Sequence, residues 1–448
     1  MESLSTFLNV PTIGPDQKVW SVVFTGFDKT TYPNRSITTY NDLLFKHNIR
    51  FVPMDSNNTE ECFYILDPAN TVRATIYAND DEPVEASDII NVINSLNGKP
   101  VTHSLTRLTV NPICPNVKKI CGEYVLGSPL NVDPYLLDFV IYSFALINQD
   151  GTFSVYSKMH LEQLSNLKNF KPDLKVIMAI GGWAADGFSD AALTPKSRFA
   201  FAREAQKWVK EYNLDGIDLD WEYPGSSASG IKSRPEDTAN FTLLIEALRM
   251  VLGESAWISV AGIADRNYIR NVEIAKIAPY INYFNVMTYD FTAGNIDESG
   301  NLHQANLYSS ELSFSNISVD LYINNLVQAG MPPEKILVGL AFYGRRGATF
   351  TKTYDEIKSN YINKNGYTIR WDNKAKAPYI VDQEGNFFLS FDNELSIYYK
   401  GQYVIENCLG GLFSWQSNYD QANMLSLAMS YAIKDPYKLE EILQSYYN

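Results

Sequence analysis

Leu214-Asp-Gly-Ile-Asp-Leu-Asp-Trp-Glu222 carries the clearest structural pattern of this 448-residue chain. It places three carboxyl groups, those of Asp218, Asp220 and Glu222, at two-residue spacing between apolar neighbours. Successive side chains of a β-strand point to opposite faces, so the three acids share one face at steps of about 6.6 Å. A surface strand with a solvated acidic edge would not explain the apolar residues between them. The pattern therefore predicts a buried strand with an acidic face.

This acidic face is a candidate catalytic site. Carboxylates held this close repel one another, and the like charge raises the pKa of at least one of them. A carboxyl group that keeps its proton near neutral pH can serve as a general acid.

From about residue 117 onward, short apolar runs alternate with amphipathic stretches, which is typical of βαβ units around a parallel sheet. Helices are predicted over Ser197–Tyr212 and Pro235–Leu252. Eight such units close most economically as a (β/α)8 TIM barrel, whose active site lies at the C-terminal ends of the strands. The eight predicted strands are Lys119–Gly122, Phe139–Leu146, Lys175–Ile180, Gly216–Glu222, Trp257–Ala264, Phe284–Tyr289, Ile336–Tyr343 and Gly410–Trp415.

Residues 1–112 are predicted to form a separate small α+β domain. They contain a helical pattern near Glu85–Leu96, and the two prolines of Asn111–Asn116 mark the domain boundary. The predicted strands of this domain are Val19–Phe24, Cys62–Leu66, Val72–Tyr77 and Leu105–Val110.

The remaining chain is divided into three predicted parts. We assign residues 117–435 to the barrel, and residues 346–389 within them to a short insertion between barrel strands seven and eight. Residues 436–448 are predicted to form a C-terminal helical tail.

The overall composition excludes several classes of protein. Hydrophobic residues at 45% and charged residues at 20% argue against disorder, and no apolar run approaches the ~18 residues of a membrane span. The net charge of −14 would repel phosphate backbones, which argues against a nucleic-acid partner. The 29 Tyr, 23 Phe and 7 Trp make aromatic residues the outlier of the composition, although most of them belong to the core.

Neither cysteine nor histidine spacing predicts a metal site, and no cofactor is expected. The scattered histidines also argue against a histidine-based catalytic triad. The four cysteines are Cys62, Cys114, Cys121 and Cys408. The four histidines are His47, His103, His160 and His303.

The segment Asp215-Gly-Ile-Asp-Leu-Asp-Trp-Glu-Tyr-Pro224 resembles the signature of glycoside hydrolase family 18, the chitinases and their relatives. The resemblance implies substrate-assisted retaining catalysis, in which the 2-acetamido group of the sugar attacks the anomeric carbon. Glu222 would be the general acid and then the base. Asp220 would orient the acetamido group, and Asp218 would share a proton with Asp220.

Further motifs resemble those of the same family and follow in the order of the strands. Met287-Thr-Tyr-Asp290 implies that Tyr289 bonds the acetamido oxygen and that Asp290 holds the sugar at the cleavage point. Leu340–Arg345 implies that Arg345 contacts substrate hydroxyls. Gly410–Trp415 implies Trp415 as the floor beneath the sugar. The other predicted substrate-binding residues are Trp183, on the leaving-group side, with Tyr223, Met287, Phe144 and Trp371.

Three departures from the family pattern lead to further expectations. Ala179 replaces a serine of strand three, which removes a hydroxyl that would steady Asp218. Glu123 stands where strand one usually has a tyrosine, so a fourth carboxyl is expected near the cluster. The insertion 346–389 is shorter than usual, which predicts a shallower groove.

The resemblance favours an endo-acting chitinase that cuts β-1,4-linked N-acetylglucosamine in chitin or chito-oligosaccharides. One alternative is an endo-β-N-acetylglucosaminidase that acts on N-glycans, and another is a sugar-binding subunit of a larger, toxin-like assembly. Residues 1–112 are assigned a docking role in such an assembly or mere packing on the barrel. They contain one tryptophan, Trp20, unlike the aromatic row of a chitin-binding module.

The N-terminus predicts no secretory signal peptide, because it lacks a basic n-region and an apolar h-region. Polymeric chitin lies outside the cytoplasm. We therefore expect extracellular action after export by a non-classical route or within a complex, with a cytoplasmic enzyme acting on a soluble substrate as the alternative.

Overall fold

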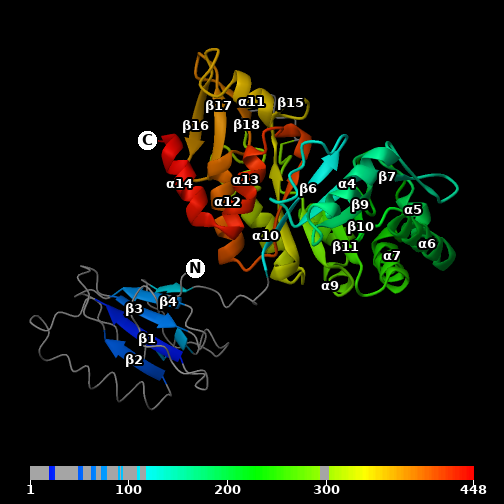
Figure 1. Cartoon of the computed structure of the whole chain (residues 1–448), viewed down its shortest axis with the longest axis horizontal. Coiled ribbons are helices and arrows are strands. Elements are labelled where there is room, and N and C mark those ends of the chain that lie inside the picture. The colour runs from blue at the N-terminus through cyan, green and yellow to red at the C-terminus, as the bar shows by residue number, and fades with distance from the viewer. Residues whose placement is uncertain are drawn as a thin grey trace, which may run out of the picture. The chain divides into compact units, whose positions relative to one another are not determined.

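The computed structural model describes residues 118–292 and 302–447 together with short segments nearer the N-terminus. The chain divides into two compact units, Met1–Pro115 and Asn116–Asn448. Both are drawn in Figure 1. The predicted boundary at 111–116 lies outside the described residues. The described segments of the first unit are 20–25, 49–53, 62–66, 72–77, 89–90, 92–93 and 108–110.

The described part of the first unit contains a five-stranded sheet of order β2-β1-β3-β4-β5. Strand β1 pairs parallel with β2 and antiparallel with β3. The sequence pattern predicted four of these strands but not β2, whose short apolar run is interrupted by Arg50 and Pro53. The strands are β1 (Trp20–Thr25), β2 (Ile49–Pro53), β3 (Cys62–Leu66), β4 (Val72–Tyr77) and β5 (Leu108–Val110).

The second unit is a closed barrel of eight parallel strands. The order is β6-β19-β13-β12-β11-β10-β9-β7, and a further pairing of β6 with β7 closes the ring. A ninth strand, β8 (Phe153–Val155), pairs antiparallel with β7. This confirms the predicted (β/α)8 fold. The barrel strands are β6 (Ile120–Leu126), β7 (Phe139–Ile147), β9 (Lys175–Gly181), β10 (Gly216–Asp220), β11 (Trp257–Gly262), β12 (Tyr283–Val286), β13 (Ile336–Ala341) and β19 (Gly411–Trp415).

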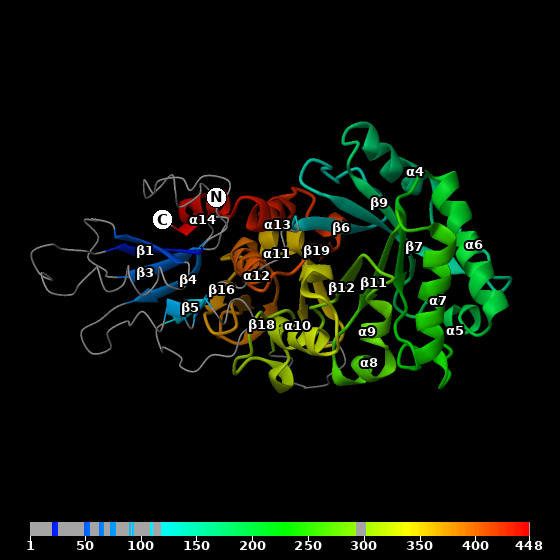
Figure 2. The same cartoon turned by 90° about the horizontal axis from the view of Figure 1, so that it is seen from below.

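The helices surround the barrel, and α6 and α7 lie side by side on its outer surface (Figure 2). Thr194 and Ser197 form a capping box at the start of α6, which also carries Pro195 in its first turn. Gly253, with φ +84°, ends α7. The helices are α4 (Lys158–Asn166), α5 (Phe188–Ala191), α6 (Pro195–Glu211), α7 (Asp237–Leu252), α8 (Arg266–Asn271), α9 (Ile274–Ile277), α10 (Val319–Gln328), α12 (Glu394–Glu406), α13 (Met424–Lys434) and α14 (Pro436–Tyr447).

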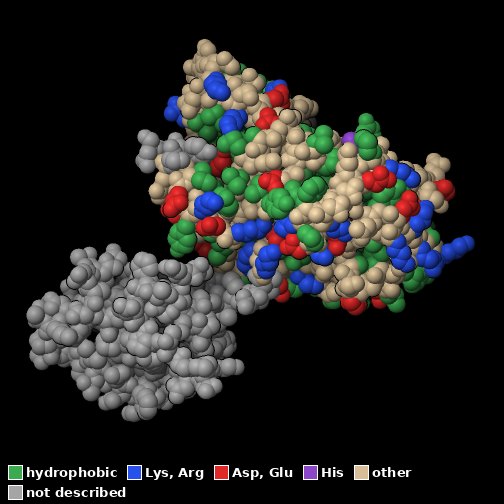
Figure 3. All heavy atoms as spheres, in the orientation of Figure 1, with side chains coloured by type: hydrophobic (Ala, Val, Ile, Leu, Met, Phe, Trp, Pro, Cys, Tyr) green, Lys and Arg blue, Asp and Glu red, His purple; other side chains and the backbone are tan. Residues whose placement is uncertain are grey.

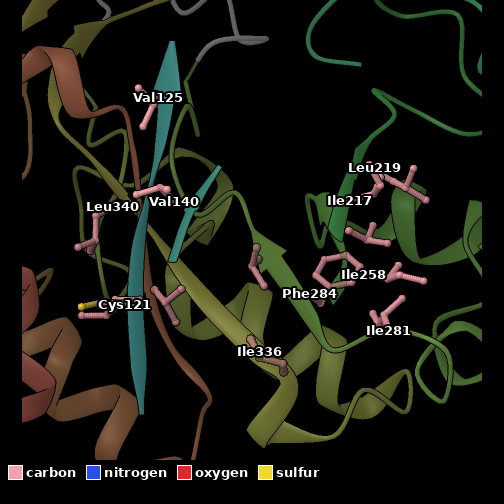
Figure 4. Packing of buried hydrophobic residues seen from close by; sticks show 14 of the residues in the cluster. Cys121, Val125, Val140, Ile217, Leu219, Ile258, Ile281, Phe284, Ile336 and Leu340 are labelled. Carbon is pink, nitrogen blue, oxygen red and sulfur yellow. The ribbon is translucent and has the colours of Figure 1, made fainter. Parts of the chain in front are cut away.

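Each barrel strand alternates between an inner and an outer packing layer. On β10 the outward Ile217 and Leu219 are fully buried and pack with Ile258 of β11 and Phe284 of β12 (Figure 4). The intervening residues, among them Asp218, face the lumen, because side chains alternate along a strand. The apolar outer layer therefore fixes the direction in which the acids point.

The insertion after β13 is an antiparallel sheet of order β15-β14-β18-β17-β16 with one helix. Its later strands stand together at the top of the unit in Figure 1. The buried pair Lys400 and Asp392, 2.7 Å apart, ties its end to the barrel, because Asp392 also accepts a bond from the Ala341 backbone. The elements are β14 (Tyr343–Arg346), β15 (Phe350–Thr353), α11 (Tyr354–Asn360), β16 (Thr368–Asp372), β17 (Ala377–Val381) and β18 (Phe387–Ser390).

The surface of the second unit carries both signs of charge. Figure 3 shows Lys and Arg side chains interspersed with Asp and Glu over the visible face. Within the part of the chain that is described, no helix combines the length and the apolar character needed to cross a membrane.

Candidate active site

The three acids of the signature lie together at the C-terminal end of β10. Asp218 and Asp220 belong to the strand, whereas Glu222 follows two residues after its end. Their side chains are almost fully buried, at 0%, 4% and 9% exposure. Between them, Trp221 points outward and stacks on Phe188 at 5.3 Å. The alternation of the strand therefore continues beyond its last paired residue.

Asp218, the deepest acid, is held by three hydrogen-bond donors from other strands of the barrel. Tyr124 Oη donates to Oδ2 at 2.8 Å, and Ser259 Oγ and Asn285 Nδ2 donate to Oδ1 at 2.6 and 3.2 Å. Burial raises the pKa of Asp218 to about 6, and the hydroxyls of Ser259 and Tyr124 oppose that rise. The donors thus favour the ionised form in a site that otherwise disfavours it.

The carboxyl groups of Asp220 and Glu222 repel each other when both are ionised. Burial raises the pKa of Asp220 well above its usual value, and the charges of Glu222 and Asp218 raise it further. Burial also raises the pKa of Glu222 to about 7, against a hydrogen bond from Tyr223 that lowers it. Asp220 Oδ1 is buried and has no hydrogen-bond partner among the residues that the structure describes. The group can therefore hold protons near neutrality and present one acceptor to a ligand.

A cavity of about 490 Å³ opens over these acids. Apart from Asp220, Glu222, Asp290 and two buried tyrosines, the described lining is apolar or glycine. Such a cavity, with few polar groups converging at one end, is typical of a ligand site. Its lining residues are Tyr124, Leu126, Phe144, Leu146, Gly181, Gly182, Trp183, Ala184, Ala185, Asp220, Glu222, Ala261, Met287, Tyr289, Asp290 and Trp415.

Aromatic rings form two platforms in the cavity. Trp415 stacks on Phe144 with ring centres 5.7 Å apart and an angle of 22°. Trp183 is 64% exposed and meets the ring of Tyr223 edge-on at 6.4 Å. An exposed indole beside a cavity offers a flat apolar face to a ligand. Trp415 and Trp183 thus lie where the sequence analysis expected sugar platforms, whereas Tyr223 supports Trp183 without lining the cavity.

Asp290 lines both this cavity and a second one of about 260 Å³. Tyr343 Oη donates to Asp290 Oδ1 at 2.6 Å, and Arg345 Nε lies 2.6 Å from the same oxygen. Both cavities also share Trp415. The lining of the second cavity is Asp290, Tyr343, Arg345, Thr351, Lys352, Thr353, Glu356, Trp415 and Tyr419.

Four predicted positions need correction. Strand β12 ends at Val286, so Tyr289 and Asp290 follow the strand instead of ending it. Arg345 belongs to β14 of the inserted sheet and lines the second cavity, where the Ala348 carbonyl also holds it at 2.7 Å. Trp371 lines neither cavity and lies on β16 beside Tyr399, with ring centres 5.9 Å apart.

The expectation for Glu123 was wrong. Its side chain faces away from the lumen, toward α13, where it accepts a hydrogen bond from Ser426 Oγ. Its neighbour Tyr124 faces the lumen and bonds Asp218. The tyrosine expected on the first barrel strand is therefore present one residue further along.

The expected consequence of Ala179 was also wrong in part. Position 179 does lie level with Asp218 on the neighbouring strand β9 and offers no hydroxyl. Ser259, level with Asp218 on the other neighbour β11, supplies a hydroxyl instead. Sequence reasoning missed Ser259, Tyr124 and Asn285, because the level of one barrel strand against the others is not visible in the local pattern of residues.

Two glycines let β9 approach β10 beside the acids. A Cβ at Gly181, where φ is +114°, would lie 2.1 Å from the Asp220 carbonyl oxygen. The next glycine, Gly182, donates its N–H to that carbonyl at 2.9 Å. Glycine at 181 is therefore required by both space and backbone conformation. Within residues 118–292 and 302–447, no group of three or more His, Cys, Asp and Glu side chains could hold a metal ion.

Comparison with known proteins agrees with this geometry. Chitinase A1 of Niallia circulans is 34% identical over 305 residues, which are 59% of this chain and 43% of that protein. This chain therefore spans less than half of that relative. Chitotriosidase-1 of Mus musculus is 28% identical over 361 residues, 73% of this chain and 75% of that protein.

Solved structures agree as well. The chitinase domain of the spore coat protein CotE from Clostridium difficile is 58% identical, covers 75% of this chain and 97% of that chain, and superposes with a TM-score of 0.56. A glycoside hydrolase family 18 N-acetylglucosaminidase from Paenibacillus barengoltzii is 34% identical over 70% of this chain and 100% of that chain, with a TM-score of 0.65. The model of Glycosyl hydrolases family 18 matches residues 119–420, more than half of the chain, and the protein therefore belongs to that family.

Proposed function

We propose that this protein is an endo-acting chitinase that hydrolyses β-1,4-N-acetylglucosamine linkages by retaining, substrate-assisted catalysis. Glu222 donates its proton to the glycosidic oxygen while the acetamido carbonyl oxygen attacks the anomeric carbon and the aglycone leaves. Asp220 accepts a hydrogen bond from the acetamido N–H and balances the positive charge of the oxazolinium ion. Glu222 then takes a proton from water, whose oxygen attacks the anomeric carbon. This opens the oxazolinium ring and retains the configuration of the sugar.

The position of the carboxyl groups carries this proposal. Glu222 and Asp220 stand on one side of the cavity at the end of a single strand, so Asp220 does not face the acid across a sugar. The remaining carboxylate of the described lining, Asp290, is engaged by Tyr343 and Arg345. A nucleophile supplied by the substrate fits a site with this distribution of acids, whose Asp220 Oδ1 still lacks a partner.

Glu222→Gln tests the acid. Turnover of chromogenic chitobiose and chitotriose glycosides should fall ~10²–10⁴-fold, the usual contribution of a general acid. Glu211→Gln, an exposed position on α6, should retain the rate of the unaltered protein. Equal rates for the Glu222 variant would contradict the assignment, and tight binding without turnover by either protein would favour a sugar-binding role. A glycoside without the N-acetyl group should not be hydrolysed, and its turnover at an equal rate would contradict substrate assistance.

Release of single sugars from chain ends is a second candidate activity. It is favoured by the 34% identity to an N-acetylglucosaminidase and by the small volume of the second cavity. Chitohexaose separates the two activities. Internal cleavage yields di-, tri- and tetrasaccharides from the first turnovers, whereas release of monosaccharide alone would favour the second candidate.

We further propose that the enzyme acts outside the cytoplasm as part of a larger assembly that residues 1–112 engage. Its 58% identity to the chitinase domain of a spore coat protein supports an assembled surface layer. Cys408 is disulfide-bonded, and disulfides persist mainly in oxidising compartments. Immunogold labelling of intact producing cells or their surface layers tests this location, and exclusively cytoplasmic label would contradict it.

A further inference from the structure

The exposed Trp183 stands on a loop with an unusual backbone. Residues 182–187 join β9 to α5, and Gly182, Ala184 and Gly187 among them have φ values of +97°, +63° and +109°. A residue with a β-carbon rarely adopts a positive φ, and Ala184 keeps it only where the surroundings stabilise that conformation. Contacts from a neighbouring segment are therefore needed to hold the loop and its indole.

The segment that follows the proposed general acid supplies such contacts. It runs over residues 223–236, between Glu222 and the start of α7. Ser229 Oγ donates to the carbonyl oxygen of Glu222 at 2.8 Å, close to the chemistry. Further along, the Lys232 backbone N–H donates to Asp186 Oδ1 of the Trp183 loop at 3.2 Å. One segment thus contacts both the acid and the loop that carries the platform.

Three charged side chains strengthen this connection. Asp190 follows the Trp183 loop on α5, and Lys232 Nζ lies 2.9 Å from each of its carboxylate oxygens. Arg234 Nη2 pairs with the same carboxylate. Arg234 Nη1 also donates to Ser189 Oγ at 2.7 Å, and that hydroxyl donates to the buried Asp237 at 2.7 Å. We call Asp190, Lys232 and Arg234 the ionic clasp.

The ionic clasp lies apart from the ligand but within reach of solvent ions. None of its three residues belongs to the described lining of either cavity. The side chains of Asp190, Lys232 and Arg234 are 55%, 49% and 22% exposed. Salt screens ion pairs that are this accessible. The clasp can therefore affect a bound sugar only through the loop that it holds, and less so at high ionic strength.

We propose that the ionic clasp positions Trp183 over the leaving-group side of the cavity and makes binding of the aglycone sugars depend on ionic strength. The inference rests on the proposed chitinase function. Asp190 is a positioning residue, because it acts on the sugar through the indole. A chito-oligosaccharide carries no charge, so its own contacts give salt nothing to screen.

Calorimetric binding of chitotetraose tests the inference, with Glu222→Gln as the parent protein so that the ligand is not consumed. Adding Asp190→Ala should raise the Kd about two- to fivefold, the range of partly exposed ion pairs. Raising sodium chloride from about 0.02 M to about 0.5 M should raise the Kd of the parent by a similar factor. The Kd of the Asp190→Ala protein should not change with salt. Lys232→Met opens the same pair from the other side and should behave alike.

Trp183→Ala separates positioning of the platform from a general loosening of the fold. It should weaken binding by itself, and Asp190→Ala should then add nothing, because the two changes act through one indole. Glu311→Ala is the matched control, since Glu311 forms an exposed pair with Lys374 at 2.8 Å and is absent from the described lining of either cavity. It should change neither the Kd nor its dependence on salt.

Three results would overturn the proposal. These are additive effects of Asp190→Ala and Trp183→Ala, a Kd of the parent that salt leaves unchanged, and an equal loss of affinity in the control. Unchanged affinity in Trp183→Ala would overturn it as well. Absence of hydrolysis by the unaltered protein would refute the chitinase function, while the binding measurements still decide the inference.

Discussion

Asp218 shows how single side chains set the protonation of the site. It is fully buried, yet three donors direct hydrogen bonds at its two oxygens. Burial favours the neutral form and the donors favour the ionised form, with the result that its pKa is raised only to about 6. Asp220 lacks such donors at Oδ1, and its pKa is raised well above the usual value by burial and by the neighbouring charges. Asp218 is therefore easier to ionise than Asp220 in the site without a ligand.

Ser259→Ala should shift the pH profile. The Ser259 hydroxyl donates to Asp218 at 2.6 Å and favours the carboxylate, so its removal raises the pKa of Asp218. Because the proposed mechanism needs an ionised carboxylate beside the protonated Glu222, the acid limb of kcat/KM should move to higher pH by about one unit. Ser165→Ala, which removes a buried hydroxyl bonded to the Tyr212 carbonyl, is the control and should leave the limb in place. An unshifted limb in Ser259→Ala would contradict the assigned role of Asp218.

At the scale of elements, two consecutive residues of strand β6 have different tasks. One belongs to the candidate active site and the other affects the stability of the fold. Tyr124 faces the lumen and reaches Asp218, whereas Glu123 faces α13 and accepts a hydrogen bond from Ser426. Burial raises the pKa of Glu123 to about 7 from its ordinary 4.5. Its carboxyl group therefore affects the stability of the fold without touching the described lining of either cavity.

Glu123→Gln should flatten the dependence of stability on pH. Between pH 4.5 and 7 the folded protein holds a proton that the unfolded chain has lost, so stability falls as pH rises through this window. For Glu123 this amounts to about 2–3 kcal/mol, and a neutral glutamine removes it. Denaturant unfolding at pH 5 and pH 8 measures the difference. Glu211→Gln should keep the full decline, and equal declines in all three proteins would contradict the buried ionisation.

The sequence predicted the acidic strand because alternation alone places Asp218, Asp220 and Glu222 on one face. Glu123 was misassigned because the predicted strand stopped at Gly122. Side chains alternate along a strand, so Tyr124 points to the same face as Gly122 and Glu123 points to the opposite face. Sequence reasoning missed Ser259 because the level of one strand against its neighbour is set by the barrel and not by local pattern. Trp371 was misplaced for a similar reason. Its position depends on the register of the inserted sheet, which the short polar strands of that sheet do not reveal.

At the scale of the whole molecule, the barrel unit contains every residue of the candidate site. Asn116–Asn448 is compact by itself, and the solved chitinase domain that covers 75% of this chain is matched over 97% of its own length. A unit of this kind is expected to fold independently of its neighbour. The first unit is thus available for a task other than catalysis.

Deleting residues 1–112 tests that division. The remaining chain should hydrolyse soluble chito-oligosaccharides with a kcat/KM within about twofold of the full chain, since domains with their own core fold alone. If the first unit docks the enzyme, the full chain should sediment in a large complex from native extracts and the truncated chain should not. Loss of activity would contradict the independence of the barrel unit, and equal sedimentation of the two chains would contradict the docking role.

The close approach at Gly181 limits how this enzyme can change. Any β-carbon there would collide with the Asp220 carbonyl and separate strands β9 and β10 beside the three acids. Directed evolution toward new aglycones must therefore work on the surrounding positions, such as Ala184 and Leu146, and keep Gly181 unchanged. The cavity can therefore change at its outer lining residues while the backbone beside the acids stays fixed.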